Sequence, residues 1–225
     1  MALDFNGTTA KVDHGDINAI DGASAFTLAM WLYRKSSNAG DARDGVFDKT
    51  ATGPSCEVDY SVAGGCVAFI DAANLGSNVT NIWTTGTWNY FTYVFDGSGV
   101  AASDRLKLYR DVSLITLAYT GAIPTVLPDR GAVTFAIGRV ANVGYLDGRV
   151  AHVKAWNAAL TPAELLHEMN SYKPGRTANL IVWAPYDDGT STKDYSGNGN
   201  HGTVTAATTF AGPPIGYEAS PLTVW

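Results

Sequence analysis

The segment Gly144-Tyr-Leu-Asp-Gly-Arg-Val-Ala-His-Val-Lys-Ala-Trp-Asn-Ala-Ala-Leu-Thr-Pro-Ala-Glu-Leu-Leu166 decides the fold, because it joins a predicted sheet strand to a short helix. The start of that helix carries a hydroxyl at the N-cap and a proline at the first helical position. A carboxylate at the third helical position can bond back to the N-cap backbone, and one apolar residue on each side of these positions can pack together. The sequence therefore predicts one short helix near residues 162–170. These signals are Thr161, Pro162, Glu164 and the pair Leu160 and Leu165.

Composition favours a domain built of many strands. The chain has 225 residues, of which 11% are aromatic and only 16% are charged, so it can bury one large core. Its 24 glycines are clustered with Asn, Asp, Ser and Thr between short apolar runs, which is typical of strands joined by tight turns. We expect one all-β domain over residues 1–212 and a C-terminal extension or docking tail over residues 213–225.

Segments along the chain follow the order of a known family. They begin Ala2-Leu-Asp-Phe-Asn-Gly-Thr, Phe26-Thr-Leu-Ala-Met-Trp-Leu, Gly86-Thr-Trp-Asn-Tyr-Phe, Leu106-Lys-Leu-Tyr-Arg and Phe135-Ala-Ile-Gly-Arg, and end with the segment quoted above. This series resembles the laminin-G-like, concanavalin-A-like lectin and glucanase jelly rolls over nearly all of residues 1–216. The resemblance implies a two-sheet antiparallel sandwich.

One segment is displaced relative to the family. Asp194-Tyr-Ser-Gly-Asn-Gly-Asn-His-Gly-Thr203 is similar to a motif that in many relatives precedes the first strand, whereas here it follows the predicted helix. The chain therefore resembles a permuted member of the family.

Charge and targeting signals narrow the classes of partner. A net charge of −6, with Lys and Arg scattered singly, argues against nucleic acid as a partner. No apolar run approaches the length of a membrane span, and Met1-Ala-Leu-Asp-Phe-Asn has neither the basic nor the apolar part of a secretory signal. We expect a location on a virion or on an extracellular surface after lysis, and otherwise in the cytoplasm.

Two cysteines flank a predicted hairpin. If Gly64 and Gly65 form a two-residue turn, Tyr60 pairs with Phe69, Cys56 faces the core and Cys66 faces outward. Side chains on opposite faces of a sheet cannot form a disulfide, so the register predicts two free thiols.

The same hairpin carries a partial glycosidase motif. Glu57-Val-Asp59 resembles the start of the Glu-x-Asp-x-Glu strand of laminarinase-like glycoside hydrolases, in which residues two apart share one strand face. Ser61 stands where the third carboxylate would be, and a hydroxyl cannot replace a tuned carboxylic acid. The alternative is an outward strand face with two solvated acids, and no catalytic residue is predicted.

A calcium loop is the better chemical hypothesis. Asp194, Ser196, Asn198 and Asn200 place oxygen donors at every second position of a loop that contains glycines. In the alternative, the aspartate and the asparagines hydrogen-bond their own backbone in tight turns. No cofactor is required in either case, and His-x-x-x-His spacing, typical of zinc sites, does not occur.

Aromatic residues near turns and the apolar tail suggest two kinds of partner. Trp83, Tyr119 and Tyr145 lie near turn signals and could form a sugar-stacking platform, with partial burial as the alternative. The tail ends in Leu222-Thr-Val224-Trp225, which either folds back on the sandwich or docks on a neighbouring subunit.

Two classes of function compete. The first is a non-enzymatic surface interaction protein, in concrete form a phage virion decoration or adhesion protein held by a protein lattice, a neighbouring subunit or a second copy of the chain. The second is a lectin-like module that binds a cell-surface glycan, and a retaining glycoside hydrolase is a weaker third hypothesis. Fold alone cannot choose between them.

Overall fold

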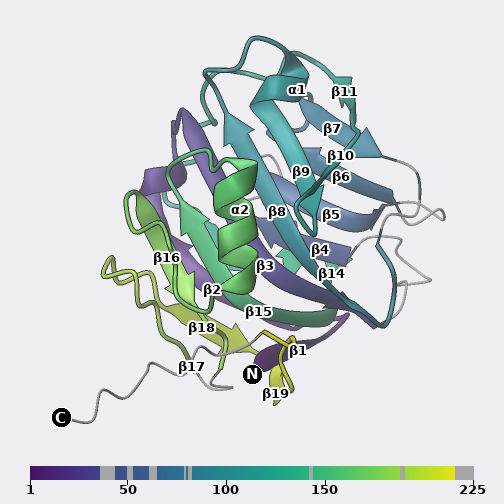
Figure 1. Ribbon diagram of the computed structural model, residues 1–225, viewed down its shortest axis with the longest axis vertical. Coiled ribbons are helices and arrows are strands. Elements are labelled where there is room, and N and C mark those ends of the chain that lie inside the picture. The colour runs from purple at the N-terminus through teal and green to yellow at the C-terminus, as the bar shows by residue number, and fades with distance from the viewer. Residues whose placement is uncertain are drawn as a thin grey trace.

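Two antiparallel sheets pack face to face in the computed structural model of the protein (Figure 1). The structure describes residues 1–35, 44–49, 53–60, 65–78, 80, 83–141, 144–187 and 191–215. Within these ranges the chain is mostly strand, and the two-sheet jelly roll predicted from the sequence is confirmed.

The first sheet contains the longest strands. Its centre is formed by β8, β3 and β15, and β16 pairs with β15 beside β1. In order across the sheet its strands are β10 (Ser113–Ile115), β9 (Leu106–Arg110), β8 (Trp88–Asp96), β3 (Ala25–Arg34), β15 (Asp147–Trp156), β1 (Ala2–Asn6) and β19 (Thr208–Phe210), with β16 (Leu180–Ala184) attached to β15.

The second sheet is made of shorter strands, and the small β13–β14 hairpin packs on β4. In order its strands are β11 (Ala118–Thr120), β7 (Leu75–Asn78), β6 (Gly65–Phe69), β5 (Ser55–Tyr60), β4 (Asp44–Asp48), β12 (Thr134–Ile137), β2 (Lys11–Asp16), β18 (Gly202–Thr205) and β17 (Ser191–Thr192). The separate hairpin pairs β13 (Arg139–Val140) with β14 (Gly144–Tyr145).

The main core lies between the two sheets. Alternate residues of β3 enter it, because successive side chains of a strand point to opposite faces. At its centre the rings of Phe26, Phe47, Tyr93 and Phe135 contact one another at centroid distances of 5.0–6.5 Å, in tilted and edge-to-face arrangements that aromatic pairs favour.

Helix α2 (Pro162–Asn170) covers part of the outer face of the first sheet (Figure 1) and confirms the predicted helix. The Thr161 hydroxyl accepts a hydrogen bond from Glu164 N at 3.3 Å, and the Glu164 carboxylate accepts one from Thr161 N at 2.8 Å. Leu160 and Leu165 are buried in a second apolar cluster beneath the helix. One-turn helix α1 (Ala102–Arg105) and the 3₁₀ turn η1 (Asn18–Ile20) were not predicted.

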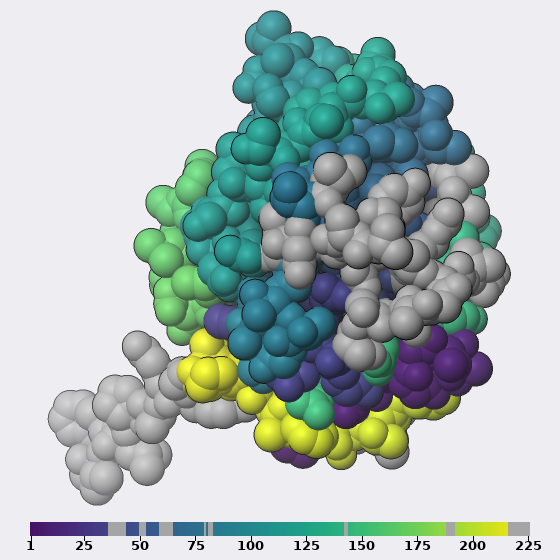
Figure 2. Space-filling view, turned by 90° about the vertical axis from the view of Figure 1, so that its right-hand side faces the viewer, coloured from purple at the N-terminus to yellow at the C-terminus, as the bar shows by residue number. Residues whose placement is uncertain are grey.

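The C-terminal strands lie against the N-terminal ones. β19 pairs with β1, and β18 pairs with β2. Figure 2 shows the same contact as yellow C-terminal residues packed beside purple N-terminal residues. The end of the displaced segment therefore lies beside β2, and the strand that follows it lies beside β1, although both are at the other end of the sequence.

The register of the β5–β6 hairpin differs from the prediction. Tyr60 pairs with Gly65 and Val58 with Cys66, and the predicted turn residue Gly64 lies outside the described residues. This register differs from the predicted one by an odd number of residues, which reverses the face of Cys66. The prediction of an outward Cys66 is therefore wrong, because both thiols are buried.

Both cysteines are free thiols in the structure, for a different reason from the predicted one. Cys56 and Cys66 are diagonal neighbours on one face. Such residues lie roughly 7–8 Å apart, with their Cβ atoms somewhat closer but still farther apart than a disulfide allows. Burial raises the pKa of the Cys66 thiol to about 12, which suppresses the reactive thiolate.

Over the described residues, no helix has the length and apolarity needed to cross a bilayer.

Candidate functional site

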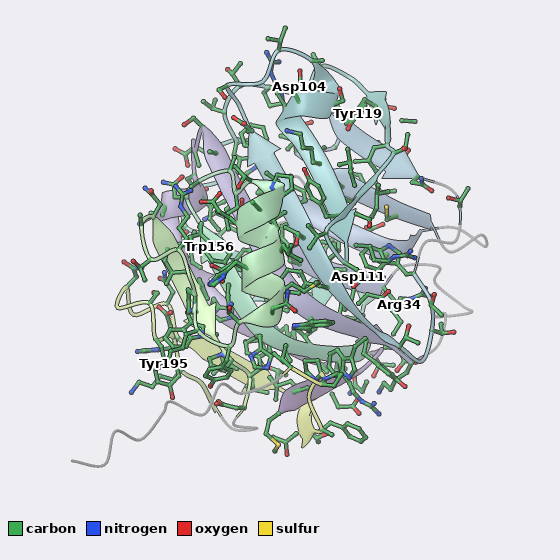
Figure 3. All side chains as sticks on the ribbon, viewed as in Figure 1. Arg34, Asp104, Asp111, Tyr119, Trp156 and Tyr195 are labelled. Carbon is green, nitrogen blue, oxygen red and sulfur yellow. The ribbon has the colours of Figure 1, made fainter. Side chains whose placement is uncertain are left out.

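Three aromatic side chains meet at the surface and form what we call the aromatic row: Tyr172, Trp183 and Tyr195. The Tyr172 and Trp183 rings lie 6.0 Å apart at 77°, and those of Trp183 and Tyr195 lie 5.5 Å apart at 50°. Tyr195 is 48% exposed and the other two are half-buried. Tyr195 lies at the rim of the fold in Figure 3.

The row is held by backbone contacts from separate segments. Tyr172 follows α2, Trp183 lies on β16, and Tyr195 lies between β17 and β18. Trp183 N donates to the Asp194 carboxylate at 2.9 Å, and Trp183 O accepts from Tyr195 N at 2.8 Å. The two neighbouring rings are thus fixed by main-chain hydrogen bonds, which gives the surface a defined shape before any ligand binds.

Polar groups border the row. The Tyr172 hydroxyl donates to Asp187 at 3.0 Å, and the Lys193 ammonium lies 5.1 Å from the centre of the Tyr195 ring. The Trp183 indole nitrogen is buried and has no hydrogen-bond partner in the part of the chain that the structure describes. Flat apolar faces beside directional polar groups are the features that a sugar-binding surface requires.

The predicted calcium loop lies directly behind the row. Both carboxylate oxygens of Asp194 are already engaged: Oδ1 accepts from Trp183 N and Ser196 N at 2.9 Å, and Oδ2 accepts from the Ser196 hydroxyl at 2.7 Å and from Asn200 N at 3.0 Å. The Asp194 side chain therefore organises the loop and attaches it to β16.

The remaining loop residues bond to the same strand. The side-chain amides of Asn198 and Asn200 donate to β16 carbonyls at 2.8 Å and 2.7 Å. Gly197 and Gly199 have φ values of 93° and 75°, which glycine adopts without the penalty of a Cβ. Asp194 thus bonds the backbone of its own turn, as in the alternative to a metal site, whereas the two asparagine side chains bond β16 instead.

Calcium takes 6–8 oxygen ligands, and in this arrangement both Asp194 carboxylate oxygens and the Ser196 hydroxyl already take part in protein hydrogen bonds. Calcium binding by this loop stays a prediction, and these bonds favour the turn-forming role. We expect the thermal midpoint of the protein to be the same in calcium and in chelator, and Asp194→Ala to lower the unfolding free energy by more than about 2 kcal/mol in both. Calcium at about a hundred times its dissociation constant that added roughly 2.7 kcal/mol of stability would restore the metal hypothesis.

The platform predicted from Trp83, Tyr119 and Tyr145 is not assembled. Trp83 is only 1% exposed and its ring packs 5.7 Å from that of Phe91, so its predicted exposure is wrong. Its carbonyl accepts a hydrogen bond from buried Arg34 at 3.1 Å, which holds the residue inside.

The other two platform residues lie on separate elements. Tyr119 is half-buried on β11 and its hydroxyl donates to Leu106 O at 2.8 Å, whereas Tyr145 is half-buried on β14. In Figure 3, Tyr119 lies at the opposite end of the molecule from Tyr195. Their part in glycan binding stays a prediction.

A second group of aromatic rings lies on the outer face of the first sheet. The Arg149 guanidinium lies 4.7 Å from the centre of the Tyr33 ring and 3.4 Å from that of Phe210, and it pairs with Asp4 at 3.2 Å. Since the guanidinium already lies over both rings, this group offers a ligand less free ring surface than the aromatic row.

A surface pocket of about 380 Å³ lies beside α2, but its charged groups are paired with the protein. Glu164 bonds Arg176 at 2.7 Å, and Glu168 bonds the buried Lys154 at 2.7 Å. The pocket therefore presents few unsatisfied groups to a ligand. Its lining residues are Ala163, Glu164, His167, Glu168, Gly175 and Arg176.

A family model described as the concanavalin A-like lectin/glucanases superfamily, of the laminin G type, matches residues 6–166. The chain belongs to this superfamily. No curated protein sequence matches the chain. The matched residues end within α2, so β16 and the loop that build most of the aromatic row lie beyond them.

Solved structures of other proteins share this fold at low sequence identity. A candidate carbohydrate-binding protein from Bacteroides ovatus has a TM-score of 0.68 and 15% identity, covering 96% of this chain and 61% of its own. A heptameric SAP-like pentraxin from Limulus polyphemus has a TM-score of 0.51 and 14% identity, covering 73% of this chain and 79% of its own.

A third structure was solved with a sugar. Domain 4 of the extracellular arabinanase AbnA from Geobacillus stearothermophilus, in complex with arabinotriose, has a TM-score of 0.50 and 11% identity, covering 68% of this chain and 70% of its own. A NanB sialidase from Streptococcus pneumoniae, with a TM-score of 0.52, is also similar. Solved structures with this fold thus come from a candidate binding protein as well as from an arabinanase and a sialidase.

The structure describes only part of the partial glycosidase motif. Glu57 lies on β5 with 1% of its surface exposed, so the expected outward, solvated face is wrong for this residue. A retaining glycosidase needs two carboxyl groups about 5–5.5 Å apart across the glycosidic bond. Ser61 and the side chain of Asp59 lie outside the described residues.

The residues of the aromatic row were missed by sequence reasoning. Tyr195 lies inside the segment singled out for its oxygen donors, and Trp183 lies in an apolar run that reads as an ordinary core strand. The local sequence does not indicate that Trp183 contacts both Tyr172 and Tyr195, because the contacting residues are 11 or more positions apart.

Proposed function

We propose that this protein is a non-enzymatic, lectin-like domain that binds a glycan through the aromatic row. The observation that carries the proposal is the row itself, in which three partly exposed rings from three segments meet beside unsatisfied and charged polar groups. The apolar C–H face of a sugar ring packs on an aromatic face, while its hydroxyls take hydrogen bonds at the rim.

The superfamily supports this proposal. The Bacteroides ovatus protein is described as carbohydrate binding, and the arabinanase domain was solved with arabinotriose. Because these proteins share only 11–15% identity with the chain, they support the class of ligand through the fold alone.

The experiment compares two exposed aromatic residues. Tyr195→Ala removes the outer ring of the row, whereas Phe210→Ala removes a ring of similar exposure, 43% against 48%, from the Arg149 group. On a glycan array and by titration calorimetry we expect Tyr195→Ala to weaken binding at least about tenfold, or about 1.4 kcal/mol, and Phe210→Ala to leave it unchanged.

Two results would contradict the proposal. Wild-type protein that binds no glycan on the array would remove it, and so would a Tyr195→Ala variant that folds and binds like the wild type. If Phe210→Ala abolished binding instead, the ligand would bind to the outer face of the first sheet.

The second form of surface interaction, display on a phage particle or contact with a neighbouring subunit, stays a prediction. The residues on which it depends, Leu222, Val224 and Trp225, lie outside the described part of the chain. No contact among the described residues favours it over glycan binding.

A further inference from the structure

His152 occupies an unusual position at one end of the aromatic row. It lies in β15, where a bulge interrupts the pairing with β3 between Ala151 and Lys154. Its φ of 54° is in the left-handed region that a non-glycine residue rarely adopts, and its N–H donates to Pro185 O at 3.0 Å. Strain of this kind persists only where the surrounding structure imposes it, and it concentrates at functional sites.

The imidazole is buried without hydrogen bonds. The residue is 2% exposed, its ring lies 5.1 Å from that of Tyr172 at 81°, and neither ring nitrogen has a partner among the residues that are described. The two His152 nitrogens and the Trp183 indole nitrogen all belong to rings that contact Tyr172, and all three lack a hydrogen-bond partner among the described residues. A buried polar group without a partner costs free energy.

A second buried histidine, His14, differs from His152 because both of its ring nitrogens have hydrogen-bond partners. In His14, Nδ1 lies 2.8 Å from Asn200 O and Nε2 lies 2.8 Å from the Tyr186 hydroxyl, so both nitrogens serve the fold. Burial lowers the pKa of both imidazoles, and that of His152 falls to about 3, so His152 is neutral near pH 7 with one nitrogen a donor and the other an acceptor.

We infer that His152 is a ligand-binding residue of the aromatic row, whose imidazole bonds the hydroxyls of a neutral sugar directly or through one bridging water. The inference rests on the proposed function. A sugar hydroxyl both donates and accepts, so adjacent hydroxyls match a neutral imidazole, whereas a carboxylated sugar would require a cation at this end of the row. The Lys193 ammonium lies at the other end, over Tyr195.

The test uses His152→Phe, which keeps a ring in place and removes both nitrogens. The probes are hexasaccharides of β-1,4-linked glucose, mannose, xylose and galactose, with hexagalacturonate as the acidic counterpart. We expect wild type to bind at least one neutral probe more tightly than hexagalacturonate, and His152→Phe to weaken that binding at least about tenfold. The thermal midpoint of the variant should stay close to that of wild type, because the removal of two unsatisfied buried nitrogens offsets the cost of phenylalanine at positive φ.

Matched controls separate binding from folding. His14→Phe should lower the thermal midpoint, since it leaves two partners unsatisfied, and should not change the affinity of the folded protein. His152→Asn keeps a donor and an acceptor and tolerates positive φ, so it should bind more tightly than His152→Phe. It is the deciding variant if the phenylalanine protein does not fold.

The outcomes distinguish this inference from the proposed function. If Tyr195→Ala weakens binding and the two His152 variants bind like wild type, the row binds glycan and His152 does not take part. If no neutral probe binds, or if hexagalacturonate binds more tightly than all of them, the inference is overturned. If neither Tyr195→Ala nor the His152 variants affect binding of a neutral probe, both proposals fail.

Discussion

Replacing Lys154 by methionine is expected to lower the free energy of unfolding by about 3–5 kcal/mol, because it leaves the Glu168 carboxylate buried without its partner. Both side chains are 1% exposed, and the ammonium contacts Glu168 Oε2 at 2.7 Å and donates to Ser171 O at 2.7 Å. Burial lowers the pKa of Lys154, and the neighbouring Glu168 charge opposes this effect.

The pair also positions the loop that carries one ring of the aromatic row. Glu168 Oε1 accepts hydrogen bonds from Gly175 N at 2.8 Å and Arg176 N at 3.0 Å, so one carboxylate joins β15, the end of α2 and the loop that contains Tyr172. Loss of Lys154 should therefore weaken glycan binding as well as stability.

Denaturant unfolding of three variants checks this prediction. Lys154→Met combined with Glu168→Gln should regain much of the loss, because the charge is gone while an amide oxygen can still accept from the loop. Arg176→Met is the matched control, because Arg176 pairs with Glu164 of the same helix and these two side chains are 31% and 32% exposed. It should cost less than about 1 kcal/mol. Equal losses for Lys154→Met and Arg176→Met would contradict the argument.

Lys49→Met is expected to lower the free energy of unfolding of the protein by about 3 kcal/mol or more, because it too removes a buried cation from its carboxylate partners. The Lys49 side chain is 0% exposed, and its ammonium lies 2.9 Å from Asp16 Oδ1, 2.8 Å from Asp21 Oδ2 and 3.2 Å from Ile17 O. A methionine of similar length fills the space but leaves two carboxylates and a carbonyl without the cation.

A surface pair on the neighbouring segment supplies the comparison. Lys11 contacts Asp13 at 2.6 Å, but both side chains are about one quarter exposed, so Lys11→Met should cost less than about 1 kcal/mol. Thermal unfolding of the two variants measures the difference. If the free energies of unfolding of Lys49→Met and Lys11→Met lie within about 1 kcal/mol of each other, the buried ammonium does not stabilise the sheet as argued.

The sequence by itself determined the elements whose signals are local. The helix at Pro162–Asn170 could be predicted because its cap, proline, carboxylate and apolar bracket all lie within six residues. An all-β domain followed from strand patterns and glycine-rich turns, whereas the two-sheet sandwich and the displaced segment followed from the resemblance to a known family. The signals for the helix, the strands and the turns each lie within a few neighbouring residues. They can therefore be recognised without the contacts that distant segments make.

The tertiary structure alone decided where the site residues meet. A register shift moved Cys66 into the core, and a long-range hydrogen bond from Arg34 to its carbonyl holds Trp83 inside. The aromatic row and the unsatisfied imidazole of His152 exist because β15, β16 and the C-terminal loop pack together. Contacts between distant segments depend on the global arrangement of the chain, which local patterns do not encode.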